Sequence, residues 1–225
     1  MGKPTVISLG GSLIAPGNID TVFLKKFRKI ILDHAKNGKK FIIICGGGKT
    51  ARKYQESAKD VCGITGDDAD WIGIHATRLN AHLLRTIFRG HAHPNIMKDP
   101  RKKLKTDRNI IIASGWKPGF RTDYDAVMLA KNFSAKTVIN MSNIDHVYTK
   151  DPKKFRDARP IKSLGWPEFM RLIPIKWSPG LNAPFDPVAS RKAWEFGLSV
   201  VIIGRNIKNL EKCISGGKFS GTVIK

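Results

Sequence analysis

The sequence predicts an α/β fold, a three-layer αβα sandwich with a largely parallel central sheet. Apolar runs of strand length alternate along the chain with stretches in which apolar residues recur at helical spacing. In addition, two glycine-rich turns each follow an apolar run directly. Ligands of parallel sheets bind at the carboxyl ends of the strands, so both turns are expected at the binding edge.

The N-terminal part of the chain predicts a strand, a helix and a second strand. Val6–Leu9 is the first apolar run, and Asp20–Asn37 follows as an amphipathic helix that Gly38 ends. Phe41–Cys45 is apolar at every position, as expected of a parallel strand buried on both faces. The apolar face expected for the helix consists of Phe23, Leu24, Phe27, Ile30 and Ile31.

Two further helices are expected before the third strand. Lys49–Lys59 follows the second glycine turn, and Trp71–Phe88 has apolar residues three and four positions apart. We expect His75 and His82 on this helix to be core or interface residues and not ligands. The apolar face expected for the long helix consists of Trp71, Ile74, His75, Leu79, His82, Leu83 and Phe88.

The same alternation continues to the end of the chain. The later elements expected are a strand at Ile110–Ala113, a helix at Asp123–Phe133, a strand at Thr137–Met141, a helix at Pro187–Phe196 and a strand at Val200–Ile203. A stretch rich in proline and tryptophan, from Asp151 to Pro187, is expected to separate a substrate half from a nucleotide half. We expect it not to link independent domains.

Composition bounds the kind of protein. With 225 residues and 41% apolar content, the chain can bury one full core, so residues 1–225 are expected to form a single domain. Its apolar runs are too short to cross a bilayer, and the residues before the first strand do not have the pattern expected of a signal segment. Cys45, Cys62 and Cys213 are odd in number and scattered, which predicts a reducing, cytoplasmic location without a disulfide framework.

The chain is strongly basic, with 40 Lys and Arg against 18 Asp and Glu and a formal net charge of +22. The positive electrostatic field of such a charge attracts phosphorylated substrates and favours the binding of nucleic acid. The same net charge can also be ordinary solvated surface charge without a function. The densest basic stretch, Lys98–Lys105, contains a proline and predicts an exposed loop. It lacks interleaved aromatic residues and any helix-turn-helix or zinc pattern, so nucleic acid is not the expected partner.

Each glycine turn can form a phosphate cradle. Backbone amides converge on an anion where no Cβ intervenes, and a helix start adds the positive end of its dipole. The turns are Leu9-Gly10-Gly11-Ser12 and Gly46-Gly47-Gly48-Lys49. Two facing cradles suit an enzyme that moves a phosphoryl group between two phosphorylated molecules. Tight structural connections between strand and helix would use the same residues.

The second turn leaves two interpretations open. It is not a P-loop, because Ile43 stands where that motif needs glycine. It fits the dinucleotide pattern G-x-G-x-x-A, and the carboxylates that follow at the ribose-binding distance are Asp67, Asp68 and Asp70. That pattern belongs in the first βα unit, however, and here it falls in the second. Lys49 and Arg52 add positive charge beside the turn, which suits phosphate binding.

Polar segments follow two other expected strands. Residues 115–123 combine aromatic, cationic and glycine residues, as expected around a flat polar ligand. The Thr122-Asp123 pair within them also resembles a helix N-cap, which by itself would explain Asp123. Residues 140–152 place further polar side chains at the same sheet edge. Asp145 among them can equally be an ordinary turn carboxylate.

The order of these motifs resembles the amino acid kinase superfamily, and within it the uridylate (UMP) kinases of the compact archaeal type. The resemblance rests on LGGS, GGGK-TAR, GIHATRLNAHLL, a glycine-rich loop ending in TD, and SNIDHVYTKDP. It extends over almost the whole chain, to Gly221-Thr222-Val223-Ile224. It implies transfer of the γ-phosphoryl group of MgATP to UMP, giving UDP and ADP, in pyrimidine biosynthesis. It also implies a homo-oligomer, usually a hexamer.

The resemblance implies a role for each matching position. Residues 1–136 would form the acceptor half, including the N-terminal phosphate turn, and residues 137–225 the ATP half. The catalytic positions would be Lys49, Arg52 and Asp145. The ATP-binding positions would be Ser8, Leu9, Gly10, Gly11, Ser12, Gly48, Arg52, Ser142, Asn143, Tyr148 and Asp151. The UMP-binding positions would be Gly47, Asp70, Trp116, Lys117, Pro118, Gly119, Phe120, Arg121 and Thr122. Mg²⁺ would arrive with ATP, so no metal ligands are expected from the chain.

Three features depart from the pattern of the superfamily. Ser8 stands where many members have lysine, so Lys49, Arg52, Arg121 or another cation must meet the phosphoryl charge. His146 stands where a turn glycine is usual, which implies a positive φ at this position. Trp116 and Lys117 make the loop around the base bulkier and more basic than usual.

Two other functions fit the same scaffold. One is phosphorylation of another small acceptor, such as isopentenyl phosphate or a carboxylate. Asp70 and the TD loop favour a nucleoside monophosphate over these. The other is a non-catalytic nucleotide- or anion-binding protein, which Ser8 and His146 would support.

Overall fold

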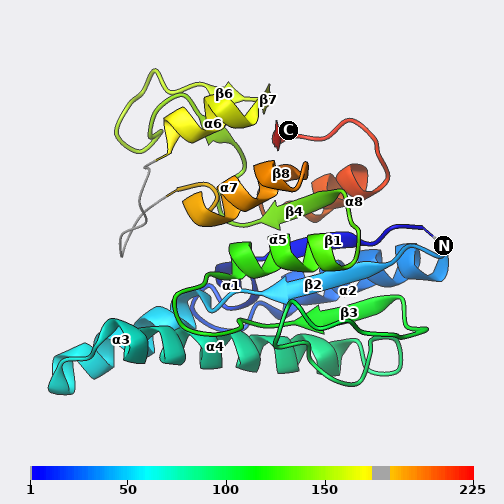
Figure 1. Ribbon diagram of the computed structural model, residues 1–225, viewed down its shortest axis with the longest axis horizontal. Coiled ribbons are helices and arrows are strands. Elements are labelled where there is room, and N and C mark those ends of the chain that lie inside the picture. Colours follow the sequence, from blue (N-terminus) through cyan, green and yellow to red (C-terminus); the bar gives the residue numbers. More distant parts are fainter. Residues whose placement is uncertain (1, 174–182) are drawn as a thin grey trace.

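The protein is described here by a computed structural model, which covers residues 2–173 and 183–225. Helices cover both faces of a sheet, so the predicted αβα sandwich is confirmed (Figure 1). Residues 174–182, part of the proline-rich stretch, lie outside the described residues. In sheet order, the strands are β3 (Ile110–Ala113), β2 (Phe41–Cys45), β1 (Thr5–Leu9), β4 (Thr137–Met141), β8 (Ser199–Ile203), β9 (Thr222–Ile224) and β7 (Ser163–Leu164).

The central strands of the sheet are parallel, as predicted. β1 pairs in parallel with β2 on one side and with β4 on the other, and the register places Leu9 beside Cys45 and Met141. β3 continues the parallel order next to β2, and β8 next to β4, whereas β9 is antiparallel to β8. The segments that follow β3, β2, β1 and β4 therefore leave the sheet side by side at one edge.

The helices form two layers whose side chains meet alternate residues of the strands. The helices are α1 (Gly11–Ile14), α2 (Thr21–Lys36), α3 (Gly48–Cys62), α4 (Gly66–Ile87), α5 (Thr122–Asn132), α6 (Trp166–Leu172), α7 (Pro187–Glu195) and α8 (Ile207–Ile214). Val6 and Ile42 face the layer of α5, α6 and α7. Ile7 and Ile43 face the layer of α1, α2, α4 and α8. This period of two explains why β2 is apolar throughout.

Helix α4 begins at Gly66, earlier than the predicted start at Trp71. A capping box explains the difference, because the amide of Asp68 donates to Thr65 Oγ1 (3.1 Å) and the amide of Thr65 donates to Asp68 Oδ2 (3.1 Å). Asp67 and Asp68 thus lie in the first turn of a helix. Of the three carboxylates proposed for a dinucleotide ribose, Asp68 is engaged in this cap.

The apolar face predicted for α4 was partly wrong. Ala81, Leu84 and Phe88 are buried in the core on this face of the sheet, and Ile74 is buried as well. Trp71 is 41% exposed, Leu79 is 64% exposed, and His75 and His82 are exposed as well. His75 and His82 are therefore not core residues. Two apolar stripes share this helix, and the periodicity alone did not indicate which one the sheet covers.

Several short elements had no sequence signal strong enough to predict them. They are α1, α6, α8, β7, β9 and the hairpin of β5 (Val147–Tyr148) with β6 (Pro160–Ile161), and the longest of them has 8 residues. Such short elements contain too few residues to show a hydrophobic period.

Within the described ranges, no helix is long and apolar enough to span a membrane.

Candidate active site

The two glycine turns pack directly against each other at the sheet edge. The amide of Gly46 donates to the carbonyl of Leu9 (2.9 Å), which joins the second turn to the end of β1. A Cβ on Gly11 would overlap the backbone of the second turn. A Cβ on Gly48, which has φ +63°, would overlap the backbone of Gly11. Glycine is required at both positions because the two backbones approach so closely.

Arg52 joins the two turns through its side chain. It lies in the first part of α3, and its Nη2 donates to Ser12 Oγ (3.2 Å) on α1. Lys49 on the same helix is exposed, and it forms no hydrogen bond or ion pair with the residues that the structure describes. The N-terminal dipole of α3 adds to these charges. An anion at the junction of the turns would therefore meet a positive potential.

A side chain of α4 also binds the backbone of the second turn. Asn80 is buried on this helix, and its Nδ2 donates to the carbonyl of Gly46 (2.8 Å). This bond fixes the position of the second turn, whose backbone contacts Gly11. Asn80 therefore has a structural role in the site.

Ser8 lies beneath the first turn, and its hydroxyl is directed at a carboxylate. Ser8 Oγ donates to Asp123 Oδ1 (3.2 Å), and the amide of Asp186 donates to Asp123 Oδ2 (3.2 Å). Burial and the nearby Asp186 raise the pKa of Asp123 to about 6, although both hydrogen bonds oppose this. The hydroxyl that replaces the usual lysine thus binds a protein group in this structure.

The interpretation of Asp123 as a helix N-cap was wrong. α5 begins at Thr122 with Arg121 at the N-cap, and no side chain caps this helix. The Asp123 side chain turns toward β1 and α7 instead. Sequence reasoning missed it as a site residue, because the local TD pattern offered a sufficient explanation. Its position at the predicted binding edge was the signal that could have identified it.

The loop of residues 115–121, hereafter the aromatic loop, is bound to α4 through two of its amides. The amide of Gly115 donates to Thr77 Oγ1 (2.9 Å), and the amide of Gly119 donates to Asp70 Oδ2 (2.7 Å). Within the same loop, the Trp116 and Phe120 rings lie 5.1 Å apart. The structure thus brings Asp70 together with the loop that the resemblance assigned to the same ligand.

The segment after β4 packs against the first glycine turn. The amide of Gly10 donates to the carbonyl of Met141 (2.8 Å), and a Cβ on Gly10 would lie 3.6 Å from Ser142 Cβ. Further along, Tyr148 donates from its hydroxyl to Asp145 Oδ1 (3.0 Å), and His146 Nδ1 lies 3.6 Å from the same oxygen. Asn143 and Asp151 are exposed.

His146 does not have the positive φ that its replacement of a turn glycine implied. Among the described non-glycine residues, Ser134 alone has a positive φ. The turn is closed by a side chain instead, because the amide of Ile144 donates to Ser142 Oγ (3.2 Å). Histidine is therefore accommodated here without left-handed backbone strain.

Asp145 is not brought into contact with the other two predicted catalytic residues. Within the described parts of the chain, its partners are Tyr148 and His146, and no bond joins it to Lys49 or Arg52. It packs instead beside the end of β8, where a Cβ on Gly204 would lie 2.9 Å from Asp145 Cβ. The predicted catalytic residues thus lie in two places, Lys49 and Arg52 at the glycine turns and Asp145 after β4.

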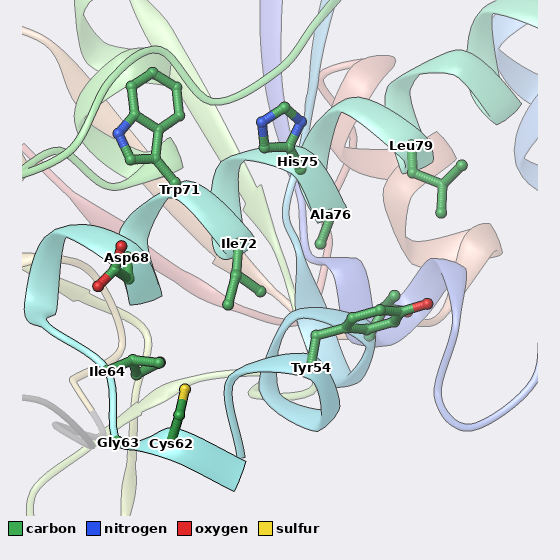
Figure 2. Close-up of a pocket in the computed structure, with 11 residues that line it drawn as sticks. Tyr54, Cys62, Gly63, Ile64, Asp68, Trp71, Ile72, His75, Ala76 and Leu79 are labelled. Carbon is green, nitrogen blue, oxygen red and sulfur yellow. The ribbon is translucent and has the colours of Figure 1, made fainter. Parts of the chain in front are cut away.

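Two grooves lie outside this site. One, of about 680 Å³, runs between α3 and α4, and Figure 2 shows Trp71, His75 and Leu79 along α4 with Tyr54 on α3. The other, of about 730 Å³, is lined by His82, Arg85, His93 and part of the basic loop. Neither is lined by a glycine of the two turns or by a residue of the aromatic loop.

The described residues contain no group of three or more His, Cys, Asp or Glu side chains placed to hold a metal ion. The carboxylate beside the turns, Asp123, already accepts hydrogen bonds at both oxygens.

Comparisons with known proteins agree over nearly the full chain. The sequence model of the amino acid kinase family matches residues 3–204. The uridylate kinase of Thermoplasma volcanium is 34% identical over 219 residues, covering 96% of this chain and 95% of that protein. The uridylate kinase of Methanocorpusculum labreanum is 34% identical over 223 residues, covering 97% and 94%. The crystal structure of uridylate kinase from Archaeoglobus fulgidus superposes with a TM-score of 0.85 at 30% identity, covering 99% and 100%. This chain belongs to the amino acid kinase family.

Proposed function

We propose that this protein is a uridylate kinase, which transfers the γ-phosphoryl group of MgATP to UMP and produces UDP and ADP. The observation that carries the proposal is the contact between the two glycine turns, with Arg52 bonded to Ser12 across them. Two phosphate-binding turns in contact bring two phosphorylated ligands together, which is what direct transfer needs. Full-length relatives that bear this name support the choice of acceptor.

We assign the acceptor nucleotide to residues 1–136 and the donor to the first turn together with residues 137–225. Gly47 and Gly48 would bind the UMP and ATP phosphates, respectively. Asp70 would bind the UMP ribose, and the base would lie against Trp116–Thr122. Ser142, Asn143, Tyr148 and Asp151 would line the ATP adenosine, beside the first turn.

The chemistry is a direct in-line transfer. A phosphate oxygen of UMP attacks the γ-phosphorus of ATP, the bond to the β–γ bridging oxygen breaks, and ADP leaves with that oxygen. Mg²⁺ bound to ATP supplies charge neutralisation on the phosphate oxygens. Lys49 and Arg52 meet the charge of the transferring group, so catalysis rests on positioning and electrostatics. Asp145 would order the polar residues on the donor side through Tyr148 and His146.

Turnover with a panel of acceptors tests the function. We expect rapid ADP formation from MgATP with UMP, and much slower formation with CMP, AMP, GMP, isopentenyl phosphate or acetylglutamate. Turnover with another acceptor would retain the mechanism and overturn the base assignment. ATP binding without turnover on any acceptor would favour a binding protein.

Replacement of Asp70 by alanine is expected to raise the KM for UMP by roughly 10–100-fold, with little change in the KM for ATP. The change removes the acceptor of the Gly119 amide and the proposed partner of the ribose. Initial rates at varied UMP measure it. Asp67→Ala is the matched control, because Asp67 lies in the same helical turn and is exposed. An equal effect of both substitutions would contradict the assignment.

We also propose a homo-oligomer, a hexamer by resemblance, in the cytoplasm. The outer stripe of α3 and α4 exposes Tyr54, Trp71 and Leu79, and clustered exposed apolar residues support an interface between copies. Three free cysteines support a reducing compartment. Light scattering after size-exclusion chromatography measures the assembly, and a monomer would contradict it.

A further inference from the structure

Asp125 is a buried carboxyl group that phosphoryl transfer does not use. It lies on α5 with no exposed surface, and its Oδ2 accepts a hydrogen bond from the amide of Trp116 (3.1 Å). Its Oδ1 is buried and has no hydrogen-bond partner among the described residues. Such a position destabilises an ionised carboxylate, because only one of its two oxygens accepts a hydrogen bond.

The groups that face Asp125 add negative charge. Asp123 on α5 and Asp99 on the loop before β3 both disfavour its ionisation. From β1, Ser8 binds Asp123, and from α7, Asp186 contributes its amide to Asp123 and its carboxylate to the N-cap of its own helix.

Asp99 also connects this carboxyl group to the aromatic loop. It forms an ion pair with Arg101 (3.0 Å), and the guanidinium carbon of Arg101 lies 4.2 Å from the centroid of the Trp116 ring. Trp116 is therefore held through its amide by Asp125 and covered at its ring by Arg101. Any change in the charge of Asp125 acts directly on the loop at this tryptophan.

We call the observed position of the aromatic loop, with the Trp116 amide bonded to Asp125, the closed loop. The pKa of Asp125 indicates which protonation state of this carboxyl group the closed loop favours. Burial, helped by the charges of Asp123 and Asp99, raises the pKa of Asp125 to about 7, although the hydrogen bond from the Trp116 amide opposes the rise. If the loop opens and water reaches the carboxyl group, the pKa returns toward its ordinary value near 4. Proton binding therefore favours the closed loop, and this preference is lost as the pH rises through about 7.

We propose that Asp125 is a positioning residue for the aromatic loop: its carboxyl group, buried beneath the Trp116 amide, favours the closed loop when neutral and disfavours it when ionised, because the closed loop keeps water from the charge. The inference rests on the proposed function in one respect, namely that this loop binds the acceptor base. By linkage, the population of the closed loop relative to the open loop falls by up to about tenfold between pH 6 and pH 8.

The kinetic test compares the wild type with Asp125→Asn, whose side-chain oxygen still accepts from the Trp116 amide but never ionises. The ratio of the wild-type KM for UMP to that of the variant is taken at each pH, so that ionisation of UMP itself cancels. We expect this ratio to rise up to about tenfold from pH 6 to pH 8, while the ratio of kcat values stays constant. Asp33→Asn, an exposed position paired with Lys29, is the control that should show no trend.

Trp116 emission provides a second test that needs no substrate. The wild-type emission minus that of Trp116→Phe is followed against pH, and we expect a transition with a midpoint near 7 that Asp125→Asn abolishes. A wild-type protein without this transition would overturn the proposal, even if the variant failed to fold. The transition together with a flat KM ratio would overturn the positioning role. Absence of UMP turnover, with the emission transition present, would instead count against the acceptor assignment alone.

Discussion

Replacement of Arg52 by alanine is expected to lower kcat by about 10³-fold while the protein stays folded. The side chain is exposed and bonds Ser12 across the two glycine turns, so its loss leaves no buried group unpaired. It removes the guanidinium that we assign to the transferring phosphoryl group, where charge must be met in the transition state. A coupled assay of ADP formation at varied ATP and UMP measures both kcat and KM.

The matched controls for this result are available on the same helix. Lys53→Ala removes one positive charge at the neighbouring exposed position, and it should leave kcat within about twofold because exposed charges interact weakly. Arg52→Lys keeps the charge without the planar fork, and it should recover only part of the activity. Equal losses in Arg52→Ala and Lys53→Ala would show that the effect is one of net charge and would contradict our assignment.

The second large effect is expected for Gly48→Ala, which should destabilise the fold by roughly 3–5 kcal/mol and abolish turnover. Gly48 has φ +63°, and an added Cβ would overlap the backbone of Gly11 in the facing turn. Neither backbone can move away easily, because each turn directly follows a strand, β1 or β2, and these two strands are paired in the sheet. Urea unfolding measures the loss in stability, and ADP formation measures the loss in activity.

Gly197→Ala is the control that separates two causes of instability, the steric overlap of an added Cβ and the left-handed backbone conformation. Gly197 has φ +61° at the end of α7, but an added Cβ would meet no atom within 4 Å. Its cost should be only about 1–2 kcal/mol, from the left-handed conformation itself. If both substitutions destabilised the protein equally, the contact between the turns would not be the reason for glycine at position 48.

Much of the candidate site could be predicted because strand ends are visible in the sequence. Leu9 and Cys45 end two apolar runs, and their neighbouring positions in the sheet followed from the βαβ rule for parallel strands. The glycine turns, the aromatic loop and the segment after β4 were therefore located before their contacts were known. Asp70, which lies on α4, was connected with the aromatic loop only by the resemblance, and the structure shows it bonded to the Gly119 amide.

The sequence by itself determined the alternation of strands and helices and the edge of the sheet at which the polar motifs meet, because these depend on local periodicity and on glycine. Only the tertiary structure decided that Asp123 faces Ser8, 115 residues away, and that Asp125 is buried beneath Trp116. It also decided which stripe of α4 the sheet covers. The physical reason is common to these cases. The environment of a side chain is set by packing partners distant in the chain, and no local pattern encodes those partners.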